Sequence, residues 1–334
     1  MKQGRKFEIW MGASVLLILI CALTALCMGQ FHIELSRVMR ELFIEHGNDN
    51  VHTTLYNIRI PRILMSLLAG AGLAASGSAF QSLFSNPLAT PDTLGVANGA
   101  SFGAALGLLL GGNAFAVQGT ALFFGIMAVL LVFLVMKGMG PSNPSMLMVI
   151  LAGMVISSLF SALVSLIKYV ADPQDVLPVI TFWLMGRFSG VTRKSLLVSL
   201  PLIGGGTAMI FLLRFRLNAL SLSEEEALSM GVNLKRVRAL VIGAAAMTTA
   251  AVVSVCGVIG WVGLLIPHIA RMLFGNDNRY VVPASVTFGA LFMLIVDTLA
   301  RCVNAAEIPV SILTAVIGAP VFILLLRKSG GIRG

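Results

Sequence analysis

The strongest constraint on the fold of this chain is a series of long apolar runs with almost no charge inside them. A helix needs about 20 apolar residues to cross a hydrocarbon core, where only helices and closed barrels satisfy the backbone polar groups. With 57% hydrophobic and 11% charged residues, the chain lacks the polar surface of a water-soluble globule. The pattern predicts an all-α integral membrane protein with about ten transmembrane helices, near residues 10–28, 63–84, 93–110, 115–136, 146–167, 195–213, 240–255, 258–274, 281–299 and 308–326.

The first apolar run follows three basic residues, as the hydrophobic region of a secretory signal peptide would. It is too long for that role, and further apolar runs follow it, so we expect a retained span. All four cysteines lie in apolar segments without Cys-x-x-Cys spacing, which favours packing roles over disulfides or zinc. The histidines and acidic residues between residues 32 and 52 match no recognised ligand spacing, so no metal site is expected.

The distribution of basic residues predicts the orientation of the spans. An even number of spans places both termini on one side of the membrane. With both termini in the cytoplasm, the cytoplasmic segments carry 14 of the 23 Lys and Arg residues but only six of the 14 Asp and Glu residues. The net charge of +9 therefore reflects membrane topology, and no nucleic-acid partner is expected.

The cytoplasmic segment 221–238 has the pattern of a short helix, a turn and a second helix. Ser223 and Glu226 have the spacing of a capping box. The acidic residues at the start of this helix lie at the positive end of its dipole. They are Glu224 and Glu225.

The second half of segment 221–238 contains a helix stop and a helix start. Gly231 is expected to end the first helix in the left-handed conformation, and Asn233 to cap the second. The second helix carries three basic residues, which are Lys235, Arg236 and Arg238. Two short helices on the membrane face suit docking to another protein, although an ordinary polar loop would have a similar composition.

Several strings along the chain resemble one family of permeases. Glu226-Ala227 with Gly231 resembles the coupling segment by which bacterial ABC importer permeases contact their ATPase. Other strings, in the same order, resemble the iron-siderophore, haem and cobalamin permease family of FecCD type. They are Arg59-Ile-Pro-Arg62, the segment from Gln81 to Gly95, Gly260 to Arg271, Asp297 to Arg301, Glu307-Ile-Pro309 and Gly318-Ala-Pro320.

This resemblance implies a type II ABC importer permease fold in the bacterial inner membrane. The chain would be one permease domain over 1–334. The small residues of 69–78 and of 243–246 predict two tightly packed interior helices, and this pairing indicates inverted halves near 58–168 and 240–327. It would pair with a second permease copy or a paralogue, two ATPase subunits and an external substrate-binding protein, all in contact with membrane lipid. No Walker A sequence is present, so ATP and Mg²⁺ are expected on the partner, with no cofactor and no enzymatic activity in this chain. The residues expected to contact the ATPase are Ser223, Glu224, Glu225, Glu226, Ala227, Gly231, Asn233 and Arg236.

Three arginines are predicted at the outer mouth of the bundle. The resemblance implies that Arg59, Arg62 and Arg301 form salt bridges with glutamates of the binding protein, and guanidinium groups suit such pairs. Two alternatives stay open. The arginines would extend to lipid headgroups, or Arg301 would pair with Asp297, four residues earlier on the same helix face.

Prolines interrupt the apolar segments at two places and are expected to break helices. Pro87 and Pro91, beside Asn86, form one place, and Pro267, beside His268, forms the other. Broken helices in a bilayer are tolerated only where protein or a water-filled cavity receives the freed backbone groups, so we expect these breaks to line the core or the pathway. A lone histidine in a packed helix is more often structural than a ligand.

Other functions are less consistent with the sequence. An ion-coupled secondary transporter usually places ionisable groups at midmembrane, whereas Asp297 is the only acidic residue well inside a predicted span. A membrane enzyme would need a nucleophile, a base or a metal cluster that the spacings do not suggest. The substrate itself is not encoded in a readable motif. Ferric siderophore is the first expectation, followed by haem, cobalamin and molybdate.

Overall fold

The computed structural model describes residues 2–29, 31–44, 50–137, 146–222, 224–303 and 306–328. Each of the ten predicted spans coincides with one helix of the described chain. Seven described helices are long and apolar enough to cross a membrane, while α5, α12 and the apolar part of α14 are shorter. The ten helices are α1 (Lys2–Cys27), α4 (Ile60–Leu83), α5 (Val96–Leu109), α6 (Ala114–Lys137), α7 (Met146–Val170), α9 (Arg193–Leu217), α11 (Leu234–Cys256), α12 (Val262–Phe274), α13 (Asn278–Val303) and α14 (Val310–Lys328).

Shorter elements connect the long helices. The apolar run of α8 is only nine residues long, so it is not readable as a span, and the sequence pattern of 168–194 did not predict it. The short elements are α2 (Leu35–Phe43), α3 (Asn50–Thr53), the π-helix η1 (Thr54–Arg59), the 3-10 helix η2 (Pro91–Leu94), α8 (Val176–Leu184), the 3-10 helix η3 (Asn218–Ser221) and α10 (Glu224–Ser229).

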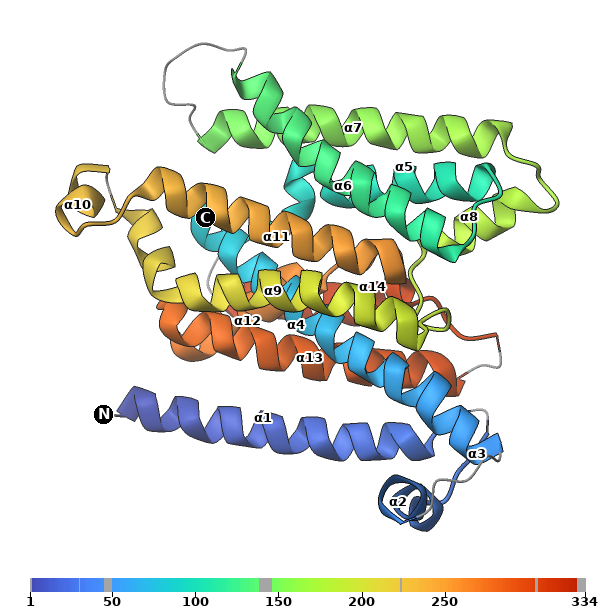
Figure 1. Ribbon diagram of the computed structural model, residues 1–334. Coiled ribbons are helices and arrows are strands. Elements are labelled where there is room, and N and C mark those ends of the chain that lie inside the picture. Colours follow the sequence, from blue (N-terminus) through green and yellow to red (C-terminus); the bar gives the residue numbers. More distant parts are fainter. Residues whose placement is uncertain are drawn as a thin grey trace.

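The long helices run side by side in one bundle (Figure 1). Helix α4 lies in its centre and packs against α9, α11, α12 and α13, while α5, α6 and α7 pack together on one flank. Helix α1 covers α13 on the other flank. The start of α1 and α10 lie toward the left of Figure 1, and α2 and α3 lie at the right. The start of α1 and the projecting α10 are thus on one side of the bundle.

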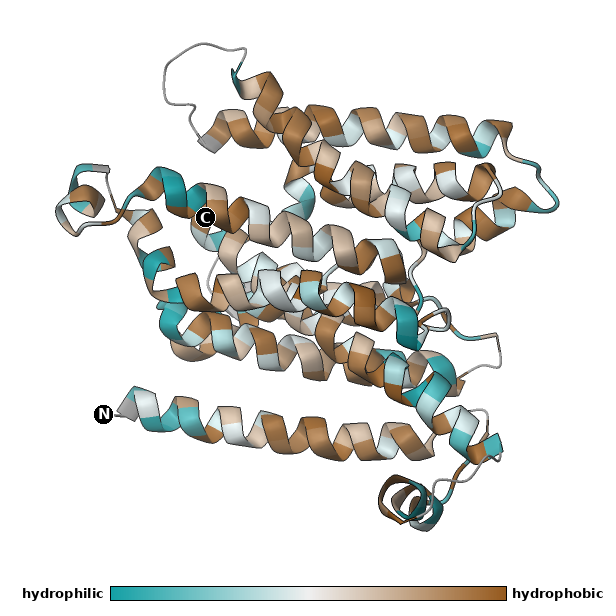
Figure 2. Cartoon of the chain, viewed as in Figure 1, coloured by the Kyte–Doolittle hydropathy of each residue, from teal (hydrophilic) through white to brown (hydrophobic). Residues whose placement is uncertain are grey.

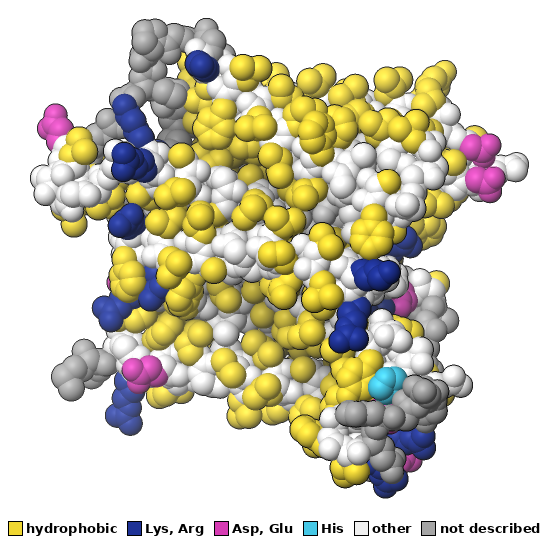
Figure 3. All heavy atoms as spheres, in the orientation of Figure 1, with side chains coloured by type: hydrophobic (Ala, Val, Ile, Leu, Met, Phe, Trp, Pro, Cys, Tyr) yellow, Lys and Arg dark blue, Asp and Glu magenta, His cyan; other side chains and the backbone are white. Residues whose placement is uncertain are grey.

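The outer surface of the bundle is apolar between two polar ends. Hydrophilic residues gather near the ends of the helices (Figure 2), and yellow hydrophobic side chains cover the middle of the face in Figure 3, with Lys and Arg toward either side. Large apolar side chains in the middle of α1 and α7, such as Leu16, Leu19 and Val155, are more than half exposed. An apolar belt of this kind is stable only in lipid.

Small residues let α4 approach its neighbours closely. A Cβ added to Gly70 would lie 2.2 Å from the carbonyl oxygen of Gly289 on α13, and one added to Gly77 would lie 1.8 Å from that of Gly263 on α12. Backbone contact of this kind is the usual way in which membrane helices pack. The small-residue stretch of α4 is therefore a tightly packed interior helix, as its sequence predicts.

The glycines that recur every fourth residue along 95–111 have two different roles. Gly99, Gly103 and Gly107 face α6, where added Cβ atoms would lie 2.5, 2.2 and 2.8 Å from its atoms. Gly95 and Gly111 lie outside α5 with φ of +76° and +68°. A spacing of four residues would place all five glycines on one face of a helix, but only the three inner ones lie within α5, because Gly95 precedes the helix and Gly111 follows it. The inverted repeat of 58–168 and 240–327 stays a prediction.

Candidate functional site

The end of the bundle opposite α10 contains a buried ion-pair cluster centred on Arg62, near the start of α4. The guanidinium donates from Nε and Nη2 to Asp297 on α13, over 2.8–3.1 Å. Its Nη1 donates to Glu307 Oε1 at 2.8 Å. The Asp297 side chain is fully buried, whereas the Glu307 side chain is 27% exposed. Arg62 thus has one inaccessible partner and one that solvent reaches.

The other two arginines predicted at this end cap helix α1. Arg59 donates from Nη1 and Nη2 to the carbonyl oxygens of Leu26 and Phe31. Arg301 donates from Nη2 to the carbonyl oxygen of Ala25. The last carbonyl groups of a helix have no partner within the helix, and cations near them interact favourably with its dipole. These arginines therefore fix the end of α1 against the bundle.

The structure corrects the expected exposure of these arginines. Arg59, Arg62 and Arg301 come together at one end of the bundle, but they are only 3–6% exposed and each is hydrogen-bonded within the chain. The expected Asp297–Arg301 pair is also wrong as a direct contact, because the Asp297 carboxylate accepts from Arg62 instead. The i to i+4 spacing permits contact along one helix, but Arg62 of the neighbouring α4 approaches the carboxylate with two donor groups.

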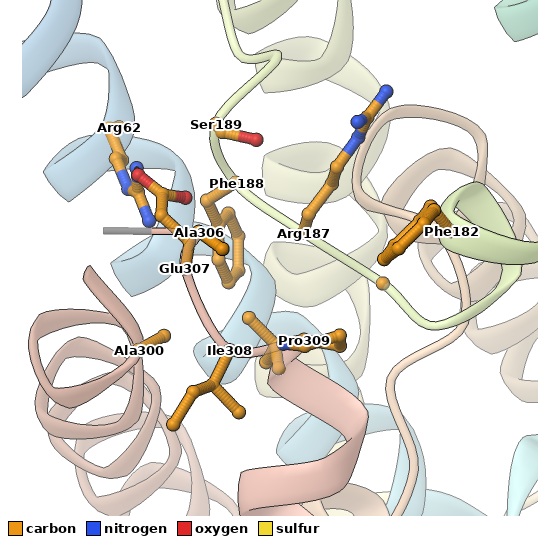
Figure 4. Close-up of a pocket in the computed structure, with 12 residues that line it drawn as sticks. Arg62, Phe182, Arg187, Phe188, Ser189, Ala300, Ala306, Glu307, Ile308 and Pro309 are labelled. Carbon is orange, nitrogen blue, oxygen red and sulfur yellow. The ribbon is translucent and has the colours of Figure 1, made fainter. Parts of the chain in front are cut away.

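A cavity of about 250 Å³ opens beside Glu307, between the α8–α9 and α13–α14 connections. Figure 4 shows the Glu307 carboxylate against Arg62, whereas Arg187 points away from both. Glu307 has φ of +51°, in the left-handed region that a residue with a side chain rarely adopts. Strained conformations of this kind collect at functional sites. Neither the cavity nor the strain is visible in the sequence.

At the opposite end of the bundle, α10 and the turn after it form a compact projection. Gly231 ends α10 with φ of +74°, as predicted. Its N–H donates to Leu228 O at 2.9 Å, and the N–H of Val232 donates to Ala227 O at 2.8 Å. This pair of bonds is the Schellman arrangement of a helix C-terminus. Ser223, and with it the predicted capping box, lies outside the described residues.

The prediction of two short helices in segment 221–238 is half correct. Asn233 caps the next helix, because its side chain accepts from the N–H of Arg236 at 3.1 Å. That helix is α11, however, and it continues without interruption to Cys256. Lys235 and Arg236 are therefore in the first turn of a spanning helix. The sequence has no helix-breaking residue between them and the predicted span at 240–255.

The surface of α10 divides into an anchor and an exposed face. Ala227 is fully buried in the core cluster. Glu225 and Glu226 are exposed beside it. Two large apolar residues, Leu228 and Met230, are 62% and 68% exposed. The sequence analysis did not select these two residues, although apolar residues in a capped polar loop are a readable signal for a protein contact.

A partly buried polar network lies at the same end of the bundle as this projection. Arg271 of α12 donates from Nη2 to Ser82 Oγ at 2.9 Å and from Nε to Gln81 Oε1 at 3.2 Å, both on α4. Ser82 in turn donates to Asn278 Oδ1 at 2.8 Å. The Oδ1 of Asn218, in η3, accepts from Asn278 Nδ2 at 2.9 Å. The network joins the segment before α10 to helices α4, α12 and α13.

The predicted proline breaks have different outcomes. Asn86, Pro87 and Pro91 lie between α4 and α5, where the Asn86 side chain accepts from the Leu88 N–H at 2.9 Å and Pro91 starts η2. Asn86 and Pro87 also line a cavity of about 560 Å³ beside the Arg271 network. Pro267, by contrast, lies inside α12.

The expected helix break at Pro267 is therefore wrong. A proline removes one helical hydrogen bond, and the carbonyl group concerned, that of Gly263, is in the first turn of α12. The loss of one bond next to a helix end is tolerated in a membrane bundle. His268 follows on the same helix and packs against the Phe322 ring, with ring centroids 5.4 Å apart. Among the described residues, no group of three His, Cys, Asp or Glu side chains is placed to hold a metal ion.

An apolar helical bundle with a projecting, capped segment at one end and a charged cluster with a cavity at the other has the architecture of a polytopic membrane permease. The model of the FecCD transport family matches residues 16–328. The chain belongs to this family of ABC importer permeases, as its motifs predict.

Individual relatives cover nearly the whole chain. It is 39% identical over 317 residues to the molybdate import system permease protein MolB of Haemophilus influenzae, covering 94% of each protein. It is 37% identical over 278 residues to a probable iron chelatin transport system permease protein of Helicobacter pylori, covering 83% of each. A solved structure of a metal-chelate type ABC transporter, in an inward-facing conformation, is 39% identical with a TM-score of 0.86, over 95% of this chain and 98% of that chain.

Proposed function

We propose that this chain is the membrane-spanning subunit of an ATP-driven importer that moves a metal chelate, with a ferric siderophore as the first candidate, into the cytoplasm. The observation that carries the proposal is the α10 projection. It is anchored by buried Ala227, ended by Gly231 and exposes Leu228 and Met230 on the side of the bundle where α1 starts. An anchored and capped segment with exposed apolar residues suits a permanent protein contact.

The partner at this projection would be an ABC ATPase. Two ATPase subunits would bind ATP and Mg²⁺ and serve two permease chains, the second being a copy or a paralogue. The polar network of Arg271 would transmit movements of the ATPase subunits to the transmembrane helices, because it links η3 to three helices of the bundle. With this contact in the cytoplasm, both termini are cytoplasmic, in agreement with the distribution of basic residues.

Reconstituted uptake tests this assignment. Proteoliposomes with the permease, its ATPase and its binding protein should accumulate substrate only with ATP, and Leu228→Ser with Met230→Ser should abolish ATPase co-purification. Leu110→Ser is the matched control, because Leu110 is 75% exposed at the opposite end. Uptake without any ATPase that collapses with an ion gradient would instead support a secondary transporter.

The substrate class is tested at the binding protein rather than in the permease. Relatives named for iron chelatin and for molybdate have similar identities, 37% and 39%, so sequence similarity does not separate the two substrates. Isothermal titration of the purified binding protein with a ferric siderophore, haem, cobalamin and molybdate distinguishes them. High affinity for molybdate alone would replace the ferric siderophore and leave the importer assignment intact.

When the binding protein docks, Arg62 would exchange its Glu307 partner for a carboxylate of the binding protein. Asp297 is inaccessible, whereas Glu307 is partly exposed and opens onto the cavity. A carboxylate of the binding protein would replace Glu307 on Nη1. Glu307→Gln should therefore strengthen docking, because an uncharged amide competes less well than a carboxylate for the guanidinium. Arg59 and Arg301 would contribute through the positive potential of this end. A low-salt pull-down in which Glu307→Gln leaves the affinity unchanged would remove Arg62 from the docking surface.

A further inference from the structure

An apolar groove runs along the side of the bundle, apart from both polar ends. It lies between α1, α4 and α9, with Ala71 of α4 and Ala290 of α13 at its floor. Its walls include Leu64 and Leu197, which are 47% and 61% exposed. The volume is about 690 Å³. Sites for small organic ligands are typically about 300–1,000 Å³, so the groove is large enough for a hydrocarbon chain.

The length of the groove matches one leaflet of a bilayer. On α4 it is lined from Ile60 to Ala71. At about 1.5 Å per residue these 11 steps span about 16 Å. The hydrocarbon core of a membrane is about 30 Å thick, so the groove extends from the bundle end near α3 to about the midplane. This is the depth that an acyl chain reaches when its headgroup is at the membrane surface.

The shallow end of the groove carries a cation. Arg193 starts α9 and lines the groove there together with Tyr56. Its position is fixed by the adjacent capping box, in which Ser195 N–H donates to Thr192 Oγ1 at 3.1 Å and Thr192 N–H donates to Ser195 Oγ at 2.9 Å. Arg193 is exposed, and in the part of the chain that the structure describes it forms no ion pair.

We propose that the groove is a binding site for an anionic phospholipid of the leaflet opposite α10. An acyl chain fills the groove between α1, α4 and α9, and the phosphate accepts hydrogen bonds from the Arg193 guanidinium, whose planar donors suit phosphate. A helix of a second protein chain fits less well, because it would cover Arg193 with apolar surface and leave its charge without a partner.

Lipid retention tests the headgroup contact. The full chain is purified in detergent, exchanged with dioleoyl phosphatidylglycerol or dioleoyl phosphatidylcholine, and analysed by native mass spectrometry. The natural protein should retain phosphatidylglycerol preferentially. Arg193→Gln should weaken that retention about tenfold, the effect of losing one charge-assisted hydrogen bond. Lys194→Gln is the matched control, since it removes the same charge from the next residue, which does not line the groove.

The apolar part of the site is tested by filling it. Ala71→Phe should abolish retention of both lipids, whereas Leu212→Phe, on an exposed position of α9 outside the groove, should change neither. Three outcomes would overturn the proposal. The first is an equal loss of lipid retention with Arg193→Gln and Lys194→Gln. The second is displacement of the lipid by glycerol phosphate alone. The third is a disulfide between two Leu197→Cys copies in membranes, which would assign the groove to a second chain.

Discussion

The two carboxylates on Arg62 should differ sharply in their effect on stability. Asp297→Ala removes a fully buried carboxylate that accepts three hydrogen bonds from the guanidinium. Breaking a buried ion pair by deleting one partner costs about 3–5 kcal/mol, because the remaining charge is uncompensated. Glu307 still accepts from Nη1, so we expect a loss near the lower limit, about 3 kcal/mol.

Glu307→Gln affects the same guanidinium from its accessible side. The Glu307 side chain is 27% exposed, so solvent screens the pair, and exposed ion pairs contribute only about 0–1 kcal/mol. The amide oxygen of glutamine also still accepts a hydrogen bond. We therefore expect Glu307→Gln to cost less than about 1 kcal/mol, several-fold less than Asp297→Ala.

The comparison is made by denaturant unfolding of the purified variants in one detergent. A double variant, Arg62→Met with Asp297→Leu, removes both buried charges and should recover most of the lost free energy of unfolding. Equal losses for Asp297→Ala and Glu307→Gln would show that burial does not separate the two partners. Absence of recovery in the double variant would show that the carboxylate stabilises the fold through contacts other than Arg62.

Other predictions concern the inner end and the helix contacts. Gly231→Ala should weaken ATPase co-purification, because a left-handed residue with a Cβ costs about 1–2 kcal/mol, while Gly190→Ala, in open space, should leave it unchanged. Arg271→Gln should leave ATPase binding intact but lower ATP-driven uptake, measured on the same proteoliposomes, because it cuts the network that links η3 to helices α4, α12 and α13. Gly103→Ala should lower the unfolding temperature and Gly119→Ala should raise it, because an added Cβ meets the α6 backbone at the first and open space at the second.

Local patterns in the sequence were sufficient for the class of fold and the ends of several helices. Apolar length and charge at the ends of each run depend only on neighbouring residues and the membrane, so a helix was predictable at each of the ten runs, seven of them long enough to span. The same holds for Gly231 and Asn233, whose turn and cap involve partners within a few residues. The family motifs, being continuous strings, were also readable.

Contacts between distant residues were decided only by the tertiary structure. Arg62 and Asp297 are 235 positions apart, so no spacing rule pairs them, and the nearer Arg301 was the natural candidate. The burial of the outer arginines, the Arg271 network and the lipid-sized groove arise in the same way, from which helices become neighbours. Side chains on different helices have no fixed offset in sequence, and the packing of small residues along α4 determines which of them meet.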